Sequence, residues 1–204
     1  MKLKPLPKKD AQLVQIVDAA LAEATRKSRK WLACRIGCTQ CCVGVFAISQ
    51  LDALRLKHGL EALEHFDPTR ARAIRKRARE SVSRLAAEFP GNLKSGILAD
   101  DEASRERFEE FGNDEPCPAL SPTTGECELY ASRPMTCRIF GPPVRTEEGL
   151  GVCELCYDGA SAEEIAACEL VTGTDALEGA LNAEAERFAQ RSGETIVAFC
   201  LAGE

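Results

Sequence analysis

Four cysteines stand within nine residues of the sequence "CRIGCTQCC": Cys34, Cys38, Cys41 and Cys42, in a chain of 204 residues that carries 11 cysteines. The first three have C-x3-C-x2-C spacing, and a tight loop with this spacing can aim three thiolates at one point. Cys38 and Cys41 alone form the C-x2-C pair that is common in zinc and iron–sulfur sites. The group predicts a metal site, with its fourth ligand supplied by a distant part of the chain.

Cys41 and Cys42 are neighbours, and neighbouring side chains of an extended backbone point to opposite sides. We therefore expect the two thiols to serve different tasks. One would face a metal, while the other would face a second metal or the core.

A second group of cysteines lies in residues 112–158, where prolines and glycines crowd together and hydrophobic periodicity is weak. It comprises Cys117, Cys127, Cys137, Cys153 and Cys156. Because little apolar surface is available to shape this segment, we expect metal to order it and to bring the two groups together. Cys168 and Cys200 lie in helical or apolar runs away from both groups, so we interpret them as packed thiols.

Two arginines flank Cys137 in "SRPMTCRIF". A zinc ion or an oxidised four-iron cluster with four thiolates carries net negative charge, which a nearby guanidinium offsets while it donates to sulfur. Arg133 and Arg138 are therefore candidates for contacts around the metal ligands. The alternative is an ordinary exposed arginine, which is the weaker interpretation for Arg138.

The cellular compartment determines whether cysteines stay reduced or form disulfides. Gln12, Gln15 and Asp18 interrupt the only stretch that could serve as a signal peptide, and no window is long and apolar enough to span a membrane. The sequence thus predicts a cytoplasmic protein without a membrane partner, in which cysteines stay reduced. An odd number of cysteines also excludes complete disulfide pairing within one chain.

Charge and motifs exclude several other functions. Residues 1–100 carry 19 Lys and Arg against 10 Asp and Glu, yet the net charge of the whole chain is −6. Solvated helix faces explain the basic half better than nucleic-acid binding does. No G-x-S-x-G, P-loop or G-x-G-x-x-G motif occurs, and nothing places His58 or His65 beside a nucleophile.

Hydrophobic periodicity predicts helices that surround the cysteine segments. We expect a mainly α fold, with helices around an irregular, metal-ordered, cysteine-rich centre and at most a small β-hairpin. Residues 1–204 form a single domain, and residues 34–156 form its metal-binding region. This region is flanked by a helix at about 9–33 and by helices at about 161–192. Between them we expect a helix that opens at "SQLD" (49–52) and breaks near Gly59, one that begins after Asp67, and one over 101–111. The tail "ETIVAFCLA" fits either a helix or a strand.

These motifs resemble the YkgJ-type cysteine-cluster family, a zinc- or iron-chelating domain with a CxxCxxCC motif. The matching pieces are "CTQCC" at 38–42, "CPAL" at 117–120 and "CELYASRPMTCRIFGPP" at 127–143, followed by Cys153. The resemblance implies metal ligation by Cys38, Cys41, Cys42, Cys117, Cys127, Cys137 and Cys153. Three residues separate Cys34 from Cys38 where the family has two, and we predict Cys34 as a further ligand. Cys156 lies outside the common pattern.

Three functions are compatible with this sequence. The first is an iron–sulfur protein, for which we predict a 4Fe-4S cluster. The family includes the flagellin lysine N-methylase, so the resemblance adds a role for S-adenosylmethionine and a protein substrate. The second is a non-enzymatic zinc-binding module, and the third is a metal carrier or sensor. Thiolates far outnumber histidines, which favours iron–sulfur over zinc. The sequence leaves open whether the protein is an enzyme.

Overall fold

Helices make up most of the regular structure, as predicted. The computed structural model describes residues 3–35, 37–146 and 149–203. The helices are α1 (Asp10–Ser28), α2 (Gln50–Phe66), α3 (Pro68–Leu85), α4 (Glu102–Glu109), α5 (Met135–Ile139), α6 (Ala162–Ala167), α7 (Asp175–Ala189) and α8 (Val197–Ala202). Three 3₁₀ turns cover Arg29–Trp31, Gln40–Cys42 and Tyr130–Ser132. None of the described helices is long and apolar enough to cross a membrane.

The strands are short and form small antiparallel pairs. β1 (Ala47–Ile48) pairs with β6 (Thr195–Ile196), and Ala47 lies opposite Ile196. β2 (Gly91–Asn92) pairs with β3 (Ile97–Leu98), and β4 (Val144–Thr146) pairs with β5 (Gly149–Gly151). The β1–β6 pair joins the chain just after the first cysteine group to the chain just before the last helix.

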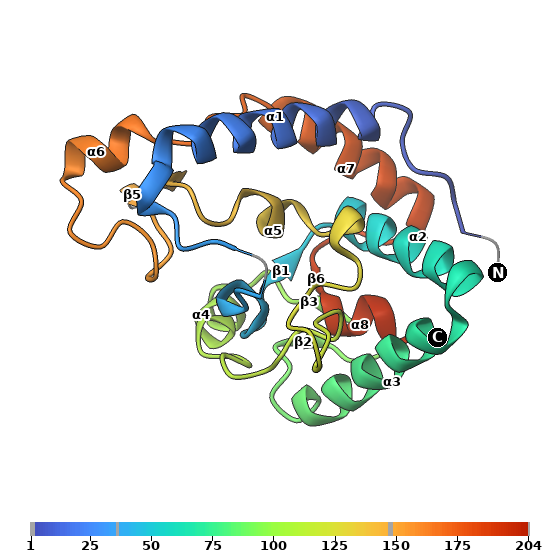
Figure 1. Cartoon of the computed structure of the whole chain (residues 1–204). Coiled ribbons are helices and arrows are strands. Elements are labelled where there is room, and N and C mark those ends of the chain that lie inside the picture. Colours follow the sequence, from blue (N-terminus) through green and yellow to red (C-terminus); the bar gives the residue numbers. More distant parts are fainter. Residues whose placement is uncertain (1–2, 36, 147–148, 204) are drawn as a thin grey trace.

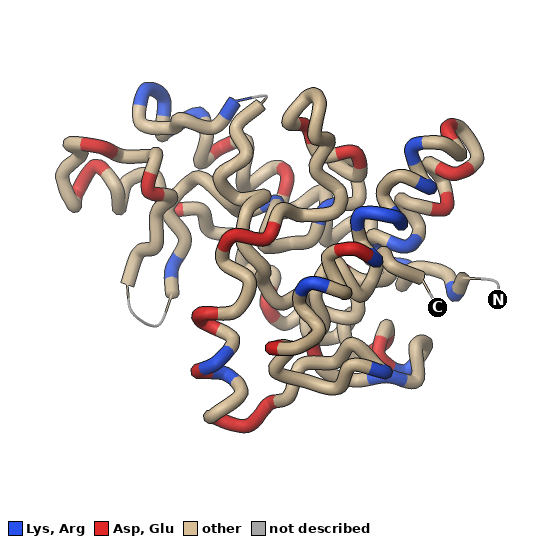
Figure 2. Tube along the Cα trace, turned by 90° about the horizontal axis from the view of Figure 1, so that it is seen from below, with Lys and Arg blue, Asp and Glu red and all other residues tan. Residues whose placement is uncertain are grey.

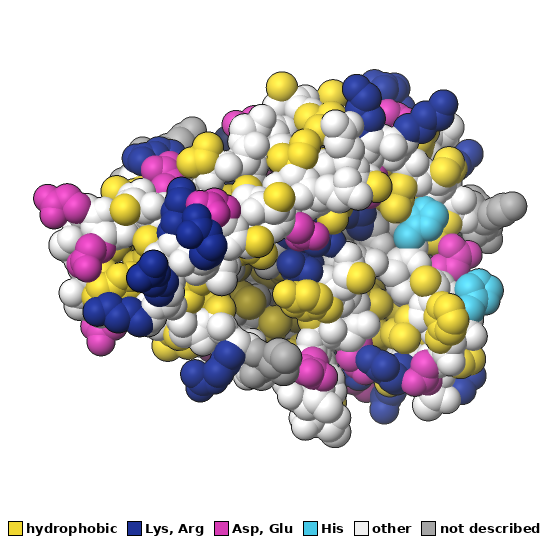
Figure 3. Space-filling view, turned by 45° about the horizontal axis from the view of Figure 1, so that its top comes forward, with side chains coloured by type: hydrophobic (Ala, Val, Ile, Leu, Met, Phe, Trp, Pro, Cys, Tyr) yellow, Lys and Arg dark blue, Asp and Glu magenta, His cyan; other side chains and the backbone are white. Residues whose placement is uncertain are grey.

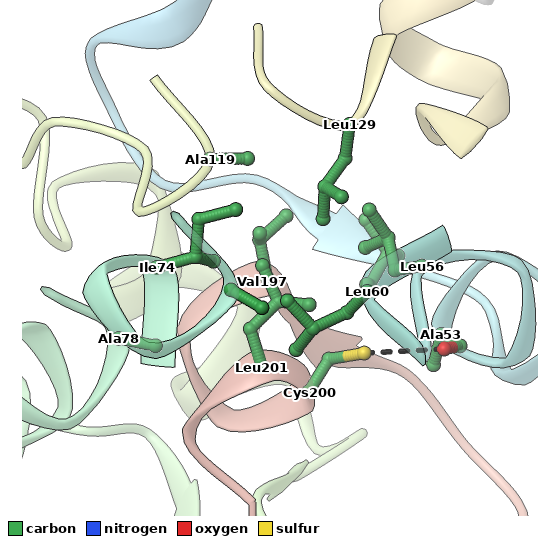
Figure 4. Close-up of a cluster of buried hydrophobic side chains, with 12 residues drawn as sticks. Ala53, Leu56, Leu60, Ile74, Ala78, Ala119, Leu129, Val197, Cys200 and Leu201 are labelled. Carbon is green, nitrogen blue, oxygen red and sulfur yellow. Dashed lines mark hydrogen bonds between the residues drawn. The ribbon is translucent and has the colours of Figure 1, made fainter. Parts of the chain in front are cut away.

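Two layers of helices enclose the core. In Figure 1, α1 and α7 run side by side across the top, and α2, α3 and α8 pack together below them. Leu56, Ile74 and Leu201 meet in the core between α2, α3 and α8 (Figure 4). Leu13 and Leu181 pack with Leu51 of α2 in the upper layer. The cysteine segments lie against the edge of both layers.

Side-chain caps set the starts of α2, α3, α4 and α6. Ser49 accepts a hydrogen bond from the Asp52 backbone N–H at 3.1 Å, and Asp67 accepts one from Arg70 at 3.0 Å. These side chains satisfy N–H groups that have no partner within the helix. The capping box of Ser161 and Glu164 is complete at the start of α6.

The predicted break near Gly59 is wrong, because α2 continues to Phe66. Gly59 serves close packing instead. A Cβ at this position would lie 2.6 Å from the Cβ of Ser132, which is in the 3₁₀ turn Tyr130–Ser132. The glycine therefore lets the segment between Cys127 and Cys137 rest directly on α2.

The tail that fitted either a helix or a strand contains both. Thr195 and Ile196 complete the β1–β6 pair, and α8 follows at once. Cys200 of α8 is buried, and its thiol donates to the carbonyl oxygen of Ala53 at 3.2 Å (Figure 4). Its interpretation as a packed thiol is confirmed by this geometry.

Residues 112–158 are better anchored than their sequence suggests. Ala119 and Leu129 point into the main core (Figure 4), and Met135 packs with Leu13 and Leu51. The expectation that little apolar surface shapes this segment is wrong for residues 112–146, since single buried side chains, rather than a periodic stripe, attach them to the helices.

A buried ion network connects three helices beneath the cysteine segments. Arg55 of α2 donates to Asp10 of α1 at 2.7 Å and to Asp52 at 2.6 Å. The same Asp52 oxygen accepts the backbone N–H of Met135, the first residue of α5, at 3.0 Å. Arg55 is only 3% exposed, so each charge depends on the others for solvation. The network fixes the start of α5, which carries Cys137.

We expect Arg55→Met to lower the free energy of unfolding by about 3–5 kcal/mol, because two carboxylates would lose their buried partner. Urea unfolding of the metal-loaded protein measures the loss. Arg75→Met is the matched control, since its pair with Glu64 is partly exposed and is worth about 1 kcal/mol or less. Equal losses in the two variants would contradict a structural role of the network.

Candidate metal centre

A cavity of about 570 Å³ opens between the helical layers and the cysteine segments. Figure 3 shows a hollow in this face, with yellow side chains, the colour that includes cysteine, at its bottom. Phe46, Leu56 and Val197 contribute apolar lining, and Arg133 contributes a positive charge. Six cysteines line the cavity: Cys38, Cys41, Cys42, Cys117, Cys127 and Cys137. The two sequence groups thus converge, as predicted.

Cys41 and Cys42 both face the cavity, so the prediction that they point in opposite directions is wrong. It assumed an extended backbone, whereas Gln40–Cys42 form a 3₁₀ turn in which the Cys42 N–H donates to Thr39 at 2.8 Å. The neighbouring Cys42 thiol, together with the nearby Arg133, lowers the pKa of Cys41 to about 6, and Cys41 in turn raises the pKa of Cys42.

Burial and nearby backbone N–H groups act in opposite directions on Cys117 and Cys127. Burial raises the pKa of Cys117 to about 11, and the N–H groups of Ala119 and Leu120 oppose this rise. Burial also raises the pKa of Cys127, where the N–H of Leu129 acts in the opposite direction. Such N–H groups favour the thiolate form, although burial outweighs them at both cysteines.

The loop between Cys117 and Cys127 is tied to the first cysteine group. The Cys117 N–H donates to the Cys42 carbonyl oxygen at 2.8 Å, next to an antiparallel bridge between Val43 and Pro116. Within the loop, the Glu128 N–H donates to Ala119 at 2.8 Å. These backbone bonds hold the thiols of both groups around one space.

Arginines of α3 hold the same loop from outside. Arg77 donates to the carbonyl oxygen of Pro118 at 2.9 Å, and it also pairs with Glu128. Arg70 pairs with Glu128 at 3.1 Å, and Arg84 pairs with Glu115 at 2.6 Å. Figure 2 shows basic and acidic residues interspersed over the chain. The sequence predicted that the basic face of α3 is solvated. Several of its arginines instead bind residues next to Cys117 and Cys127.

The two arginines beside Cys137 have different surroundings. Arg133 lines the cavity, stacks on the ring of Tyr130 at 3.9 Å and donates to the Tyr130 carbonyl oxygen at 2.9 Å. Arg138 is buried, pairs with Asp18 of α1 at 2.8 Å and donates to Ala131. Arg133 is thus placed to offset charge on the thiols, while Arg138 holds α5 against α1.

Cys137 itself lies on α5 and faces the other thiols of the cavity. Burial raises its pKa, and negative charge at Cys117, Cys41 and Cys127 raises it further. A cation within the cavity would remove this penalty. The thiols of the cavity are therefore close enough to repel one another when they ionise.

The remaining predicted ligands, Cys34 and Cys153, lie together at one end of the domain. Cys34 is exposed and Cys153 is buried, and Cys156 lies beside both. Cys156 was outside the predicted ligand set, although its C-x2-C spacing from Cys153 is a recognisable signal. The position of Cys168 also differs from the prediction, because it packs in the same small core as Cys153 and Cys156.

As the side chains stand, no three Cys, His, Asp or Glu residues in the described part of the chain are close enough to hold a single metal ion. The thiols are instead distributed around a space. His58 lies apart from them and contacts the Lys4 carbonyl oxygen at 2.7 Å.

Comparison with known proteins agrees with this donor set. Residues 33–157, more than half of the chain, match the model of the CxxCxxCC family, described as "Putative zinc- or iron-chelating domain". The chain belongs to the CxxCxxCC family, and the description of this family supports a metal ion as the binding partner. No curated protein and no solved structure matches the chain.

The metal-free protein should be alkylated first at Cys41. With its pKa near 6, this thiol is ionised at pH 7, whereas burial raises the pKa of Cys200 to about 12. Iodoacetamide labelling followed by peptide mass spectrometry gives the rate at each site. Arg133→Leu should slow labelling of Cys41 by removing a positive charge. Equal rates at Cys41 and Cys200 would contradict this description of the pair.

Proposed function

We propose that the cavity holds an iron–sulfur cluster of the 4Fe-4S type, bound by thiolates from both cysteine groups. The observation that carries the proposal is the arrangement of Cys41, Cys42, Cys117, Cys127 and Cys137 around one cavity of about 570 Å³. Thiolates spread around a space suit a cluster of several atoms, which takes four cysteine ligands at its corners.

The surroundings of these thiols fit such a cluster. Backbone N–H groups near Cys117 and Cys127 oppose the rise in their pKa, and Arg133 supplies positive charge. Hydrogen bonds to sulfur and nearby charge are the features by which a protein tunes the reduction potential of a cluster. When bound, the cluster supplies one-electron chemistry or a rigid crosslink between the two segments.

The number of thiols bears on the kind of function. Five cysteines surround the cavity apart from Cys38, and a cubane needs four. Because five thiols are available, we expect a cysteine at each of the four irons rather than one iron with an open coordination position. Transfer of a methyl group from S-adenosylmethionine to a protein lysine is the finer function that the family resemblance brings. A cluster with an open iron would support it only if two of the five thiols stayed unbound.

Anaerobic purification followed by iron and acid-labile sulfide analysis tests the proposal. We expect iron and sulfide in equal amounts. The double variant Cys41→Ser/Cys137→Ser should lose both, because it leaves three of the five thiols and a serine oxygen replaces thiolate poorly at a soft metal. Cys200→Ser should retain the cluster, because this thiol packs in the core against Ala53. A colourless protein without sulfide, or full iron in the double variant, would refute the proposal.

A further inference from the structure

Four thiols outside the group just described come together from two short turns. Cys34 and Cys38 flank a turn in which the Cys38 N–H donates to Arg35 at 2.9 Å. Cys153 and Cys156 flank a second turn, in which the Cys156 N–H donates to Cys153 at 2.8 Å. C-x3-C and C-x2-C are both within the spacing used by zinc-binding turns.

Backbone contacts hold the two turns against each other. The Tyr157 N–H donates to the Trp31 carbonyl oxygen at 2.8 Å, and the Ala33 N–H points at the Cys156 sulfur at 3.4 Å. Gly141 passes close to the first turn, where a Cβ would lie 2.9 Å from the Cys34 sulfur. The two turns therefore lie against each other at a junction between distant segments.

The thiols of this junction lie in shared surroundings. Cys153 and Cys156 are buried in one small core, and the Cys156 sulfur accepts the N–H of Ala33, the residue before Cys34. Burial raises the pKa of Cys153, and negative charge at Cys156 and Cys38 raises it further. Cys38 lines the cavity and also stands in the turn that begins at Cys34.

The core of the junction is small, and the described residues give it no fully buried aliphatic side chain. Its buried residues are Cys153, Cys156, Tyr157 and Cys168, and the partly buried residues beside them are Trp31, Leu32, Ala33, Ala160 and Ile165. The Tyr157 hydroxyl is hydrogen-bonded to Ser28 at 2.5 Å, which attaches this end of the domain to α1. A small core of this kind gains most from a crosslink by metal.

We propose that Cys34, Cys38, Cys153 and Cys156 form a second metal centre, a tetrathiolate site for a structural zinc ion that is separate from the cavity. Structural zinc takes four protein ligands in tetrahedral geometry. Since no three of the described side chains yet surround a single point, binding draws the four sulfurs inward. The ion would then fasten the chain at Trp31–Cys38 to the chain at Cys153–Tyr157.

Metal analysis of variants tests this second centre independently of the cluster. The anaerobically purified protein should carry one zinc per chain in addition to its iron. Cys34→Ser and Cys156→Ser should each lose the zinc and keep iron and sulfide, while Cys137→Ser should keep the zinc. Cys34 is exposed, so its replacement leaves the packing of the small core unchanged.

Cys168→Ser is the matched control, because Cys168 is buried in the same small core but lies outside the four thiols. It should retain the zinc. Hydrogen exchange should show that zinc added to the metal-free protein protects residues 31–35 and 153–157, and Cys34→Ser should abolish this protection. Absence of zinc from the wild-type protein, or full zinc in Cys34→Ser and Cys156→Ser, would overturn the proposal. Zinc without iron and sulfide would refute only the cluster.

Discussion

Thiolates packed into one space repel one another, and the rest of the structure depends on how this repulsion is balanced. Burial already disfavours ionisation of Cys117, Cys127 and Cys137, and each of them also responds to neighbouring sulfur charges. Backbone N–H groups and Arg133 offset part of this cost. A bound cation would offset the remainder, whereas without metal the raised pKa values keep these three thiols protonated and uncharged near neutral pH.

The framework around the thiols is organised to resist that repulsion. Arg77 and Arg70 hold Glu128 beside Cys127, and the Arg55 network fixes the start of α5 below Cys137. These contacts come from helices that contribute no cysteine to the cavity. The residues that position the cysteines are therefore distinct from the cysteines themselves. The cysteine loops can remain irregular while their ends stay fixed.

The sequence predicted the helices, their caps and the convergence of the cysteine groups, because periodicity, Ser49, Asp67 and cysteine spacing act locally. It did not predict contacts that depend on packing between distant segments. The sequence predicts a helix break near Gly59, but only the folded chain shows Ser132 beside this glycine. Likewise, the pairing of Arg77 with Glu128 and the grouping of Cys156 with Cys34 join residues that are far apart along the chain.

Val197, at the start of α8, lines the cavity, and the adjacent β6 pairs with β1 just beyond the first cysteine group. During synthesis, the ribosome therefore makes every cavity thiol before it makes the residue that completes the cavity wall. The nascent chain carries these thiols without their final surroundings until the last helix docks. A metal that enters the finished cavity would therefore do so after translation, and oxidants have the easiest access to the thiols before the last helix docks.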